Sequence, residues 1–590
     1  MQSMWHRIRQ GWKKLRQRPR LFYGLLLGLI LTVLYALLQN GYWSAGNDSE
    51  YYLTLARNLA AGRGYVFNGL PFAHYPLGWP AFLAGLLHIS RQFWFLNLVP
   101  KLLMIGTGIG YYVFMARRIA PRHAFESLLL TNILWWWYRP SYVLLSESLF
   151  LALFVIALLA ADKVREDKSP VAFLALVVLG GMFPVIRWAG IVAVPLVCVV
   201  LISGEIKPRL KTNWICAVAA CVIACGSFLL VNNYLGSRSK SAESVQTESA
   251  ESVQTDGREI GRRAPAISLL LNKAKKLTRL SRSGEWISGL FWPPLILGED
   301  FSLVGTLEVR DLSNAGGLIL WAFVLILVVR KTREKHWIWL GAILYNCVFV
   351  LIWHPLPRYL LPVAPLLIYA LFTGLSYAMS YVDRKLTLKN SKLLDLPLYL
   401  LLGAIVLPNL AILSVVVGVQ RSQDYYGTYM AGRCEELIAS GDYLRNHAPP
   451  NSKVGINPRY VNFGQNKSNT FGKAAVVMLT GLPVAESAIK VSASGPDAET
   501  MDWARANDID YFLYQPPTSP WRIWHFRMPW LQKWVKGQSD VERNPYWELY
   551  RRQNGKLERV QLTSPSQPLK QLPVFPTALT GEEGTGGVSK

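Results

Sequence analysis

Four charged residues stand at the ends of long apolar runs and carry side chains that could do chemistry. They are two carboxylates, Asp48 and Glu147, and two guanidinium groups, Arg187 and Arg358. A carboxylate at the boundary between membrane and water is costly unless it is satisfied or used, and it can accept a proton. A guanidinium group stays charged and matches phosphate oxygens in a bidentate way. Brought together, these residues could remove a proton and hold a phosphate.

Each of these residues also has a simpler interpretation. Asp48 could be a solvated cap residue beside Asn47, where a helix is expected to begin. Glu147 could neutralise Arg139 or Arg187 near the interface. The two arginines of the set could extend toward the outer headgroups of the lipid. Sequence alone leaves these alternatives open, because it does not place distant segments in space.

The composition shows which kind of chain must position these residues. Of the 590 residues, 52% are hydrophobic and only 17% are charged; soluble domains have about 45–50% and about 25%. The net charge of +25 is distributed in short blocks between apolar runs rather than on one soluble domain, which argues against nucleic-acid binding. A disordered chain, a coiled coil and an ordinary soluble enzyme are also excluded. We expect a polytopic α-helical membrane protein, embedded in the bilayer, with some mass outside it.

The apolar runs predict about eleven membrane spans. A spanning helix needs about 20 mostly apolar residues. Segment 21–39 follows the basic stretch 1–20, so we expect an uncleaved first span and a cytoplasmic N-terminus. The further candidate spans are 95–116, 123–138, 143–161, 170–186, 188–203, 213–232, 315–330, 336–353, 358–381 and 396–418.

Basic residues give the expected orientation of these spans. Segments rich in Lys and Arg alternate with segments that carry few, and the basic ones are expected in the cytoplasm. The membrane domain, 21–418, then has two long outward loops, 40–94 and 233–314. The second contains a tandem octad at 241–256, to which we assign no function.

The residues after the last span are expected outside the cytoplasm. Segments 452–458, 474–479 and 509–515 resemble short strands, and 432–447 and 498–508 resemble helices. Alternating strands and helices predict a small extracytoplasmic α/β domain at 419–562. The segment 563–590 is rich in Pro, Gly and Ser and is expected to be a flexible tail.

The first outward loop has the most informative pattern. Asn47 and Glu50 have capping-box spacing, and Gly62 is a natural stop. The helix between them, and a second one after Pro76, are expected to be amphipathic and to lie on the membrane surface. Asp48 would then sit where the first span meets the first surface helix.

Four motifs along the chain resemble one family. The first is N-D-S-E-Y-Y-L-T-L-A-R-N-L-A-A-G-R-G-Y followed by H-Y-P-L-G-W-P-A-F-L-A, which contain Asp48, His74 and Tyr75. The second is the span that opens at Glu147, and the third carries Arg187 before a Gly and a Pro. The fourth is R-Y-L-L-P, which begins with Arg358 and Tyr359.

In this order, over about residues 20–420, the motifs resemble GT-C membrane glycosyltransferases. The similar branch contains lipid A aminoarabinose transferases, protein O-mannosyltransferases and rhizobial galacturonosyltransferases. The resemblance implies transfer of a sugar from a polyprenyl phosphate to a lipid, glycan or protein acceptor on the extracytoplasmic face. It also implies inversion at the anomeric carbon. We expect a bacterial inner membrane as the location.

The resemblance implies a role for each site residue. Asp48 would be the base and Glu147 the second acid. Substrate would be bound by Arg187, Arg358, Tyr359, His74 and Tyr75. The aminoarabinose transferases have a Glu-Lys pair before the Pro-rich turn, where this chain has Ala73 and His74. A divalent metal ion therefore stays open, with Asp48 and His74 as candidate ligands; His74 could equally be an ordinary loop histidine.

Two other classes of function fit the composition. One is a transporter or flippase of lipid-linked sugars, although no repeat between the two halves is visible and the candidate charges lie at the outer interface rather than mid-membrane. The other is a catalytically silent GT-C-like scaffold.

The aromatic run Trp135–Tyr138 could be a sugar platform or part of an interfacial aromatic belt.

Overall fold

The computed structural model describes most of the chain, with gaps. Residues 1–16, Asn47, most of the loop 233–314 with its octad, and the segments 563–568 and 576–590 lie outside the described residues. The described residues are 17–44, 48–72, 74–167, 169–202, fragments between 219 and 233, 290–291, 302–303, 307–333, 338–352, 357–386, 396–421, 431–457, 459–460, 466–467, 470–487, 496–514, 547–562, 569–573 and 575.

Apolar helices form the larger part of the molecule. Helix α2 (Pro19–Leu37) begins at a proline, which has no N–H to leave unpaired in a first turn. Leu21 and Leu25 are exposed, whereas Leu27 and Leu31 are buried against the neighbouring helices. One face of α2 therefore packs on the protein, and the opposite face has the composition that suits lipid.

Helices occupy the predicted spans within the described residues, but only some meet the requirements for crossing a membrane. By length and composition, four described segments do: Pro19–Leu37, Phe93–Ala116, Arg358–Lys385 and Leu396–Ser414. The total of about eleven spans therefore stays a prediction, and 213–232 lies mostly outside the described residues. Besides α2, the helices described at the predicted spans are α5 (Phe93–Ala116), α6 (Pro121–Ile133), α7 (Trp135–Tyr138), α8 (Glu147–Asp167), α9 (Pro170–Ile186), α10 (Ala193–Ile202), α14 (Val309–Arg333), α15 (Ile338–Ile352), α16 (Ala364–Leu386) and α17 (Leu396–Arg421).

The expected continuous span 123–138 is interrupted. Leu134 adopts an extended conformation between α6 and α7. The freed backbone N–H of Trp135 donates to Asn409 Oδ1 of α17, at 3.0 Å. Trp135, Trp137 and Tyr138 are buried, so these three form neither an exposed sugar platform nor an interfacial belt. Trp136 is partly exposed, so for the run as a whole the two interpretations stay open.

The first outward loop folds into two helices, as expected. These are α3 (Asp48–Ala60) and α4 (Gly78–Ile89), joined by the hairpin of β1 (Val66–Phe67) and β2 (Leu70–Pro71). Helix α3 packs against α4 and also against α19 (Thr470–Thr480) from the C-terminal region. Its polar face is therefore largely covered by protein, a contact that amphipathic periodicity does not reveal.

The C-terminal region contains a five-stranded mixed sheet of order β11-β10-β9-β5-β8. Strand β5 (Val454–Ile456) pairs in parallel with β8 (Val484–Glu486) and with β9 (Tyr511–Tyr514). Antiparallel pairing then joins β9 to β10 (Glu548–Gln553) and β10 to β11 (Lys556–Arg559). The helices of this region are α18 (Ala431–His447), α19 (Thr470–Thr480) and α20 (Ala498–Ala506), and the short pairs are β3 (Ser302–Leu303) with β4 (Leu307–Glu308) and β6 (Arg459–Tyr460) with β7 (Asn466–Lys467).

The strand expected at 474–479 is wrong, because these residues lie inside α19. They are buried, and a short fully apolar run does not distinguish a buried strand from a buried helix. Strands do occur within 452–458 and 509–515, and helices at the two positions expected for them. The boundary of a separate extracytoplasmic domain, 419–562, stays a prediction.

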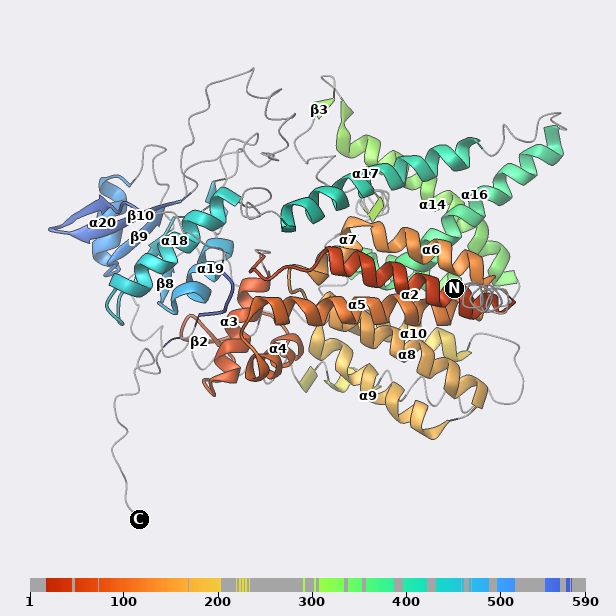
Figure 1. Ribbon diagram of the computed structural model, residues 1–590, viewed down its shortest axis with the longest axis horizontal. Helices are drawn as coiled ribbons and strands as arrows, with labels where there is room; N and C mark the ends of the chain where they lie inside the picture. Colours follow the sequence, from red (N-terminus) through yellow and green to blue (C-terminus); the bar gives the residue numbers. More distant parts are fainter. Residues whose placement is uncertain are drawn as a thin grey trace, which may run out of the picture.

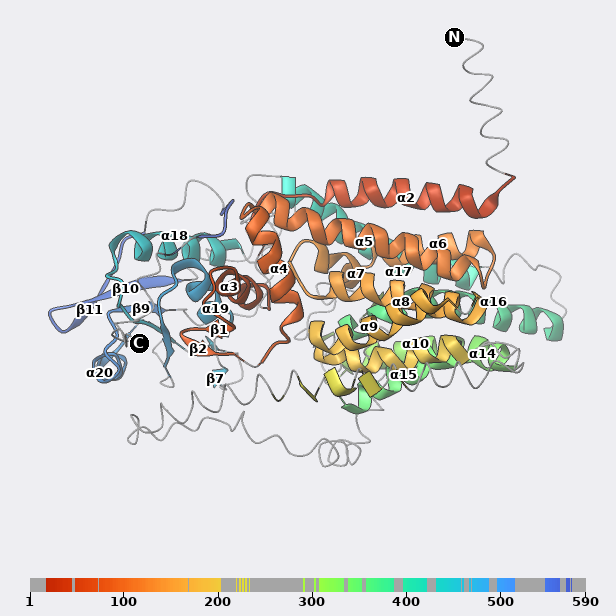
Figure 2. The same ribbon diagram turned by 90° about the horizontal axis from the view of Figure 1, so that it is seen from below.

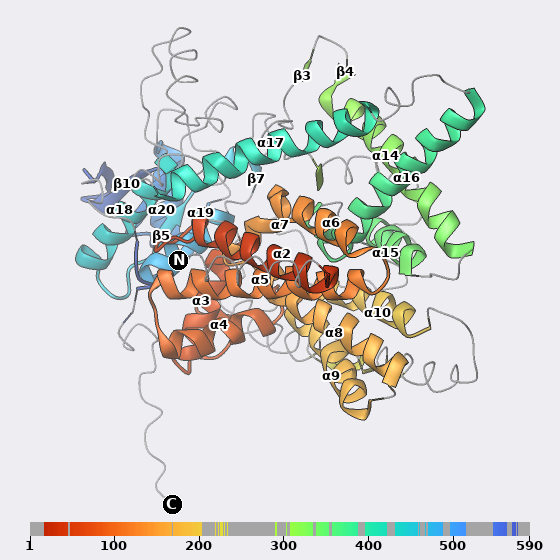
Figure 3. The same cartoon turned by 45° about the vertical axis from the view of Figure 1, so that its right-hand side comes forward.

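The arrangement of these parts explains which residues can meet. Helices α2, α5, α6 and α8 run side by side, and the C-terminal sheet lies beyond one end of this bundle (Figures 1 and 2). Helices α3 and α4 lie between the bundle and the sheet. Helix α17 crosses the bundle and leads toward α18 (Figure 3). The first outward loop is thus the junction between the two parts.

Candidate active site

The four charged residues of the motifs meet at this junction. Arg358 Nη1 donates to Asp48 Oδ2 at 2.8 Å and lies 3.8 Å from Glu147 Oε1. Arg187 forms an ion pair with the same oxygen of Glu147. The side chains of Glu147 and Arg187 are 4% and 11% exposed, and those of Asp48 and Arg358 are 18% and 23% exposed. The cluster is therefore mostly buried, with its Asp48–Arg358 side the more open to solvent.

Asp48 is held from two directions. It is the first residue of α3, where a carboxylate interacts favourably with the helix dipole. The Tyr75 hydroxyl donates to Asp48 Oδ1 at 2.7 Å, so each carboxylate oxygen accepts a hydrogen bond from a different segment. Asp48 is therefore oriented by its partners, which argues against a freely solvated cap residue.

Glu147 is presented by a turn that is anchored on several sides. Helix α8 begins at Glu147 instead of near residue 143, because residues 142–146 form a turn in which Leu144 has a φ of +54°. The Leu144 carbonyl accepts a hydrogen bond from Trp79 Nε1 at 2.9 Å. A buried lysine, Lys101, donates to the carbonyl oxygen of Ser141 at 3.2 Å. These contacts fix the chain just before the carboxylate.

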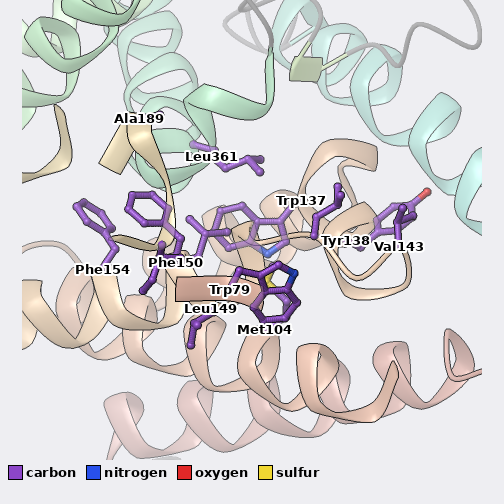
Figure 4. Close-up of a cluster of buried hydrophobic side chains, with 14 of the residues drawn as sticks. Trp79, Met104, Trp137, Tyr138, Val143, Leu149, Phe150, Phe154, Ala189 and Leu361 are labelled. Carbon is purple, nitrogen blue, oxygen red and sulfur yellow. The ribbon is translucent and has the colours of Figure 1, made fainter. Parts of the chain in front are cut away.

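A dense apolar cluster supports the turn and the start of α8. Side chains from α4, α5, α7, α8 and the segments around Arg187 and Arg358 interdigitate there (Figure 4). The labelled members of this cluster are Trp79, Met104, Trp137, Tyr138, Val143, Leu149, Phe150, Phe154, Ala189 and Leu361. Because such packing resists displacement, the start of α8 keeps a defined position, and Glu147 with it.

Arg187 and Arg358 come from irregular segments at helix ends. Arg187 is extended, between α9 and a short 3₁₀ helix, Trp188–Val192. Arg358 lies in the 3₁₀ segment Pro357–Val363, before α16. The guanidinium carbons of both arginines lie 5.6 Å from the ring centre of Tyr359. Tyr359 therefore belongs to the cluster as a shared cation–π partner.

The charges of the cluster determine its protonation. Burial raises the pKa of Asp48, but the Arg358 charge, the Tyr75 hydrogen bond and the Arg187 charge lower it by more, so the net shift is downward. Burial and the neighbouring Asp48 raise the pKa of Tyr75. Asp48 is thus ionised and Tyr75 neutral at pH 7. Two carboxylates and two guanidinium groups leave the cluster balanced in formal charge.

His74 does not join the cluster through its ring. Its side chain is exposed and packs edge-to-face on Tyr75, with 4.9 Å between ring centres. Its backbone carbonyl accepts from Trp188 Nε1 at 3.0 Å. Within the described part of the chain, no group of three or more His, Cys, Asp or Glu side chains could hold a metal ion. The pairing of Asp48 with His74 as metal ligands gains no support from this geometry.

Several residues at the site were not identified from the sequence. The Tyr52 hydroxyl lies 3.5 Å from Ser146 Oγ and so links α3 to the turn before Glu147. The ring of Tyr52 also packs on Tyr75, at 5.0 Å between centres. For Lys101 the sequence does carry a signal, because a lysine inside an apolar run is uncommon and needs a partner.

The ion pairs also bear on the simpler interpretations. Arg187 and Arg358 point to carboxylates of the same chain, which argues against extension toward lipid headgroups. Glu147 does neutralise Arg187, one of the two arginines proposed for that purpose. This contact is compatible both with a structural ion pair and with a chemical role.

Comparisons with known proteins give distant structural matches. No protein-family model and no curated protein matches this sequence. One similar solved structure is the archaeal oligosaccharyltransferase AglB from Archaeoglobus fulgidus in complex with an inhibitory peptide and a dolichol-phosphate. The sequence identity is 14%, the match covers 84% of this chain and 69% of that one, and the TM-score is 0.48. Another is ArnT from Cupriavidus metallidurans bound to undecaprenyl phosphate, with 13% identity, 89% and 97% coverage, and a TM-score of 0.46.

At these identities and scores, what the chain does has to be inferred from its own residues. The resemblance to GT-C membrane glycosyltransferases therefore stays a prediction from the four motifs.

Proposed function

We propose that this chain is an integral-membrane glycosyltransferase. It moves a sugar from a polyprenyl-phosphate donor to a hydroxyl of a lipid, glycan or protein acceptor, at the extracytoplasmic boundary of a bacterial inner membrane. The observation that carries the proposal is the Asp48–Arg358 contact, with Glu147 and Arg187 adjoining it. These four residues come from four distant segments, and together they put a proton acceptor beside two cations that could bind a phosphate.

The chemistry that we assign to the cluster is one displacement at the anomeric carbon. The acceptor oxygen forms a bond to this carbon while the bond to the phosphate oxygen breaks, and the phosphate leaves with the electron pair. Asp48 takes the acceptor proton. Arg187 and Arg358 bind the phosphate as its negative charge grows. Glu147 holds the two guanidinium groups in place.

The ends of α8 support an extracytoplasmic site. Glu147 is at the start of this helix, and Asp162, fifteen residues later, is about 22 Å away at 1.5 Å per residue. Asp162 pairs with Arg118 and lies 3.8 Å from Arg117. If this basic end lies in the cytoplasm, as loop charges predict, Glu147 and its partners lie at the opposite boundary.

The assay that tests the proposal uses the purified full chain in lipid vesicles. A panel of undecaprenyl- and dolichyl-phosphate sugars is added with hydroxyl acceptors, and consumption of each donor is followed. We expect at least one donor to lose its sugar, either to an acceptor or to water. Movement of intact donor across the vesicle membrane without consumption would instead indicate a flippase, and no effect on any donor would favour a scaffold.

Tyr75→Phe tests whether the Tyr75 hydroxyl tunes the base. The hydroxyl lowers the pKa of Asp48, so its removal raises that pKa and moves the acid limb of the kcat/KM profile to higher pH. Loss of one hydrogen bond of about 1 kcal/mol predicts about a fivefold loss of transfer. The matched control is Tyr65→Phe: the Tyr65 hydroxyl donates to the carbonyls of Tyr75 and Pro76, not to Asp48. An acid limb that moves equally in both variants would contradict this role.

A further inference from the structure

The end of the chain returns to the site-bearing loop. We name residues 569–573 and Phe575 the C-terminal strap. The strap pairs with the start of α5: the N–H of Phe93 donates to the Lys570 carbonyl at 2.9 Å, and the N–H of Leu572 to the Arg91 carbonyl at 3.1 Å. The N–H of Trp43 donates to the Leu569 carbonyl at 3.0 Å. The flexible tail predicted for 563–590 stays untested as a whole, but these residues are held by backbone bonds.

Phe575 ends the strap between α3 and the C-terminal region. The guanidinium carbon of Arg57, in the last turn of α3, lies 4.2 Å from the centre of the Phe575 ring. Gly481 has a φ of +74°, and a Cβ there would lie 2.7 Å from the ring. Only glycine combines this backbone conformation with so close an approach. The ring therefore contacts a cation and lies close to a glycine at the end of α19.

Arg57 joins α3 to the end of α19. Its Nη1 donates to the Met478 carbonyl at 2.7 Å and its Nη2 to the Val477 carbonyl at 3.2 Å. The last carbonyls of a helix carry partial negative charge and favour such a cation. Burial, and then the charge of Arg63, lower the pKa of Arg57 to about 9. The two carbonyls and the Phe575 ring are therefore what compensates this buried charge.

The neighbouring hairpin is fixed to the same region. Asn68, at the turn between β1 and β2, donates from Nδ2 to the Val484 carbonyl at 3.0 Å. Its Oδ1 accepts from the Val484 N–H at 2.7 Å. One side chain therefore satisfies both backbone groups at the start of β8. The loop that carries Asp48 is held at its hairpin and at the far end of α3.

From these contacts we infer that the C-terminal strap and Arg57 position Asp48. The inference rests on the proposed function, in which Asp48 is the base, and it makes the strap a positioning element rather than part of the acceptor site. Asp48 and Arg57 are opposite ends of one helix, about 14 Å apart at 1.5 Å per residue. Release of the far end lets α3 move as a unit, which displaces the carboxylate from Arg358.

The other charged groups of the cluster come from elements other than α3. Arg187 follows α9 and Arg358 precedes α16. Release of the strap should therefore leave phosphate binding in place and misplace only the base. A displacement of about 1 Å can cost about 10²-fold in rate. The expected signature is a lower kcat with an unchanged KM for the donor, which general unfolding would not produce.

The test compares full-length protein with chains that end at residue 568 or at residue 576. The first lacks the strap and the second keeps Phe575. We expect the shorter chain to lose about 10²-fold in kcat with a donor KM within about twofold of the full-length value, and the longer chain to keep both. Phe575→Ala and Gly481→Ala should also lower kcat at an unchanged donor KM, but by a smaller factor. Phe575→Tyr should keep the full-length kcat, because it keeps the aromatic ring.

Hydrogen exchange separates failure of this inference from failure of the proposed function. Amides of α3 should exchange faster in the chain that ends at 568 and in Phe575→Ala, whether or not any donor is consumed. Unchanged exchange in α3, unchanged kcat, or equal losses in kcat and donor affinity would each overturn the inference. A full-length chain that consumes no donor would overturn the proposed function alone.

Discussion

Asp48→Asn should abolish most sugar transfer, with a loss of about 10²–10⁴-fold in kcat. An asparagine amide cannot accept the acceptor proton, whereas the carboxylate can. The substitution is nearly isosteric, and its side-chain oxygen can still accept the Tyr75 hydrogen bond that the carboxylate accepts at 2.7 Å. The fold should therefore survive. The measurement is turnover of the consumed donor in lipid, with thermal unfolding of the same samples.

The matched control is Asp502→Asn. Asp502 is exposed on α20 and pairs only with Arg505 among the described ion pairs, so this variant should transfer sugar at the normal rate. Comparable activity of Asp48→Asn and the unsubstituted protein would remove Asp48 as the base. Loss of activity together with a large fall in unfolding temperature would reduce Asp48 to a structural residue.

Arg358→Gln should show the second large loss, about 10²–10³-fold in kcat/KM. Its guanidinium group contacts Asp48 at 2.8 Å and approaches Glu147 at 3.8 Å. Without it, Asp48 loses its ion-pair partner, Glu147 keeps only Arg187, and the leaving phosphate loses a cation. Arg358→Lys should retain part of the activity, because an ammonium keeps the charge but not the bidentate geometry.

Donor affinity and a second arginine complete this test. Binding of undecaprenyl phosphate, measured in nanodiscs, should weaken in both Arg358 variants. Arg139→Lys makes the same chemical change at an arginine that stacks on Trp136, with 5.3 Å from its guanidinium carbon to the ring centre; it should leave transfer and binding unchanged. Equal effects at positions 139 and 358 would mean that charge near the membrane, not a phosphate site, is being measured.

The ordered motifs predicted the convergence of the site better than they predicted its contacts. Asp48, Glu147, Arg187 and Arg358 each follow or begin an apolar run, so they could be placed at one boundary from periodicity and loop charge. The pairing of each carboxylate with a guanidinium group depends on how the four segments lie relative to one another and on how far each side chain extends. The Tyr75–Asp48 and Tyr52–Ser146 contacts depend on how the first loop folds back, and no local pattern encodes that.

The fold shows the same division between local and long-range information. The ends of α5, α9 and α3 follow from local signals such as prolines, glycines and the lengths of apolar runs. The break at Leu134 needs Asn409, 275 residues later in the chain, to satisfy the freed N–H group. Residues 474–479 lie in α19, which packs on α3 and covers part of its polar face. Neither the helix nor this burial can be predicted from one segment without the other.

We propose one site at the junction, in which Arg187 and Arg358 bind the donor phosphate and Asp48 faces it. This proposal is tested most directly by a structure of the full chain in nanodiscs with undecaprenyl phosphate, determined by electron microscopy. We expect the phosphate within hydrogen-bonding distance of the guanidinium groups of Arg187 and Arg358, with Asp48 facing it and the lipid chain running along the apolar helices. Phosphate density elsewhere, with these two arginines still bound only to Asp48 and Glu147, would contradict the account.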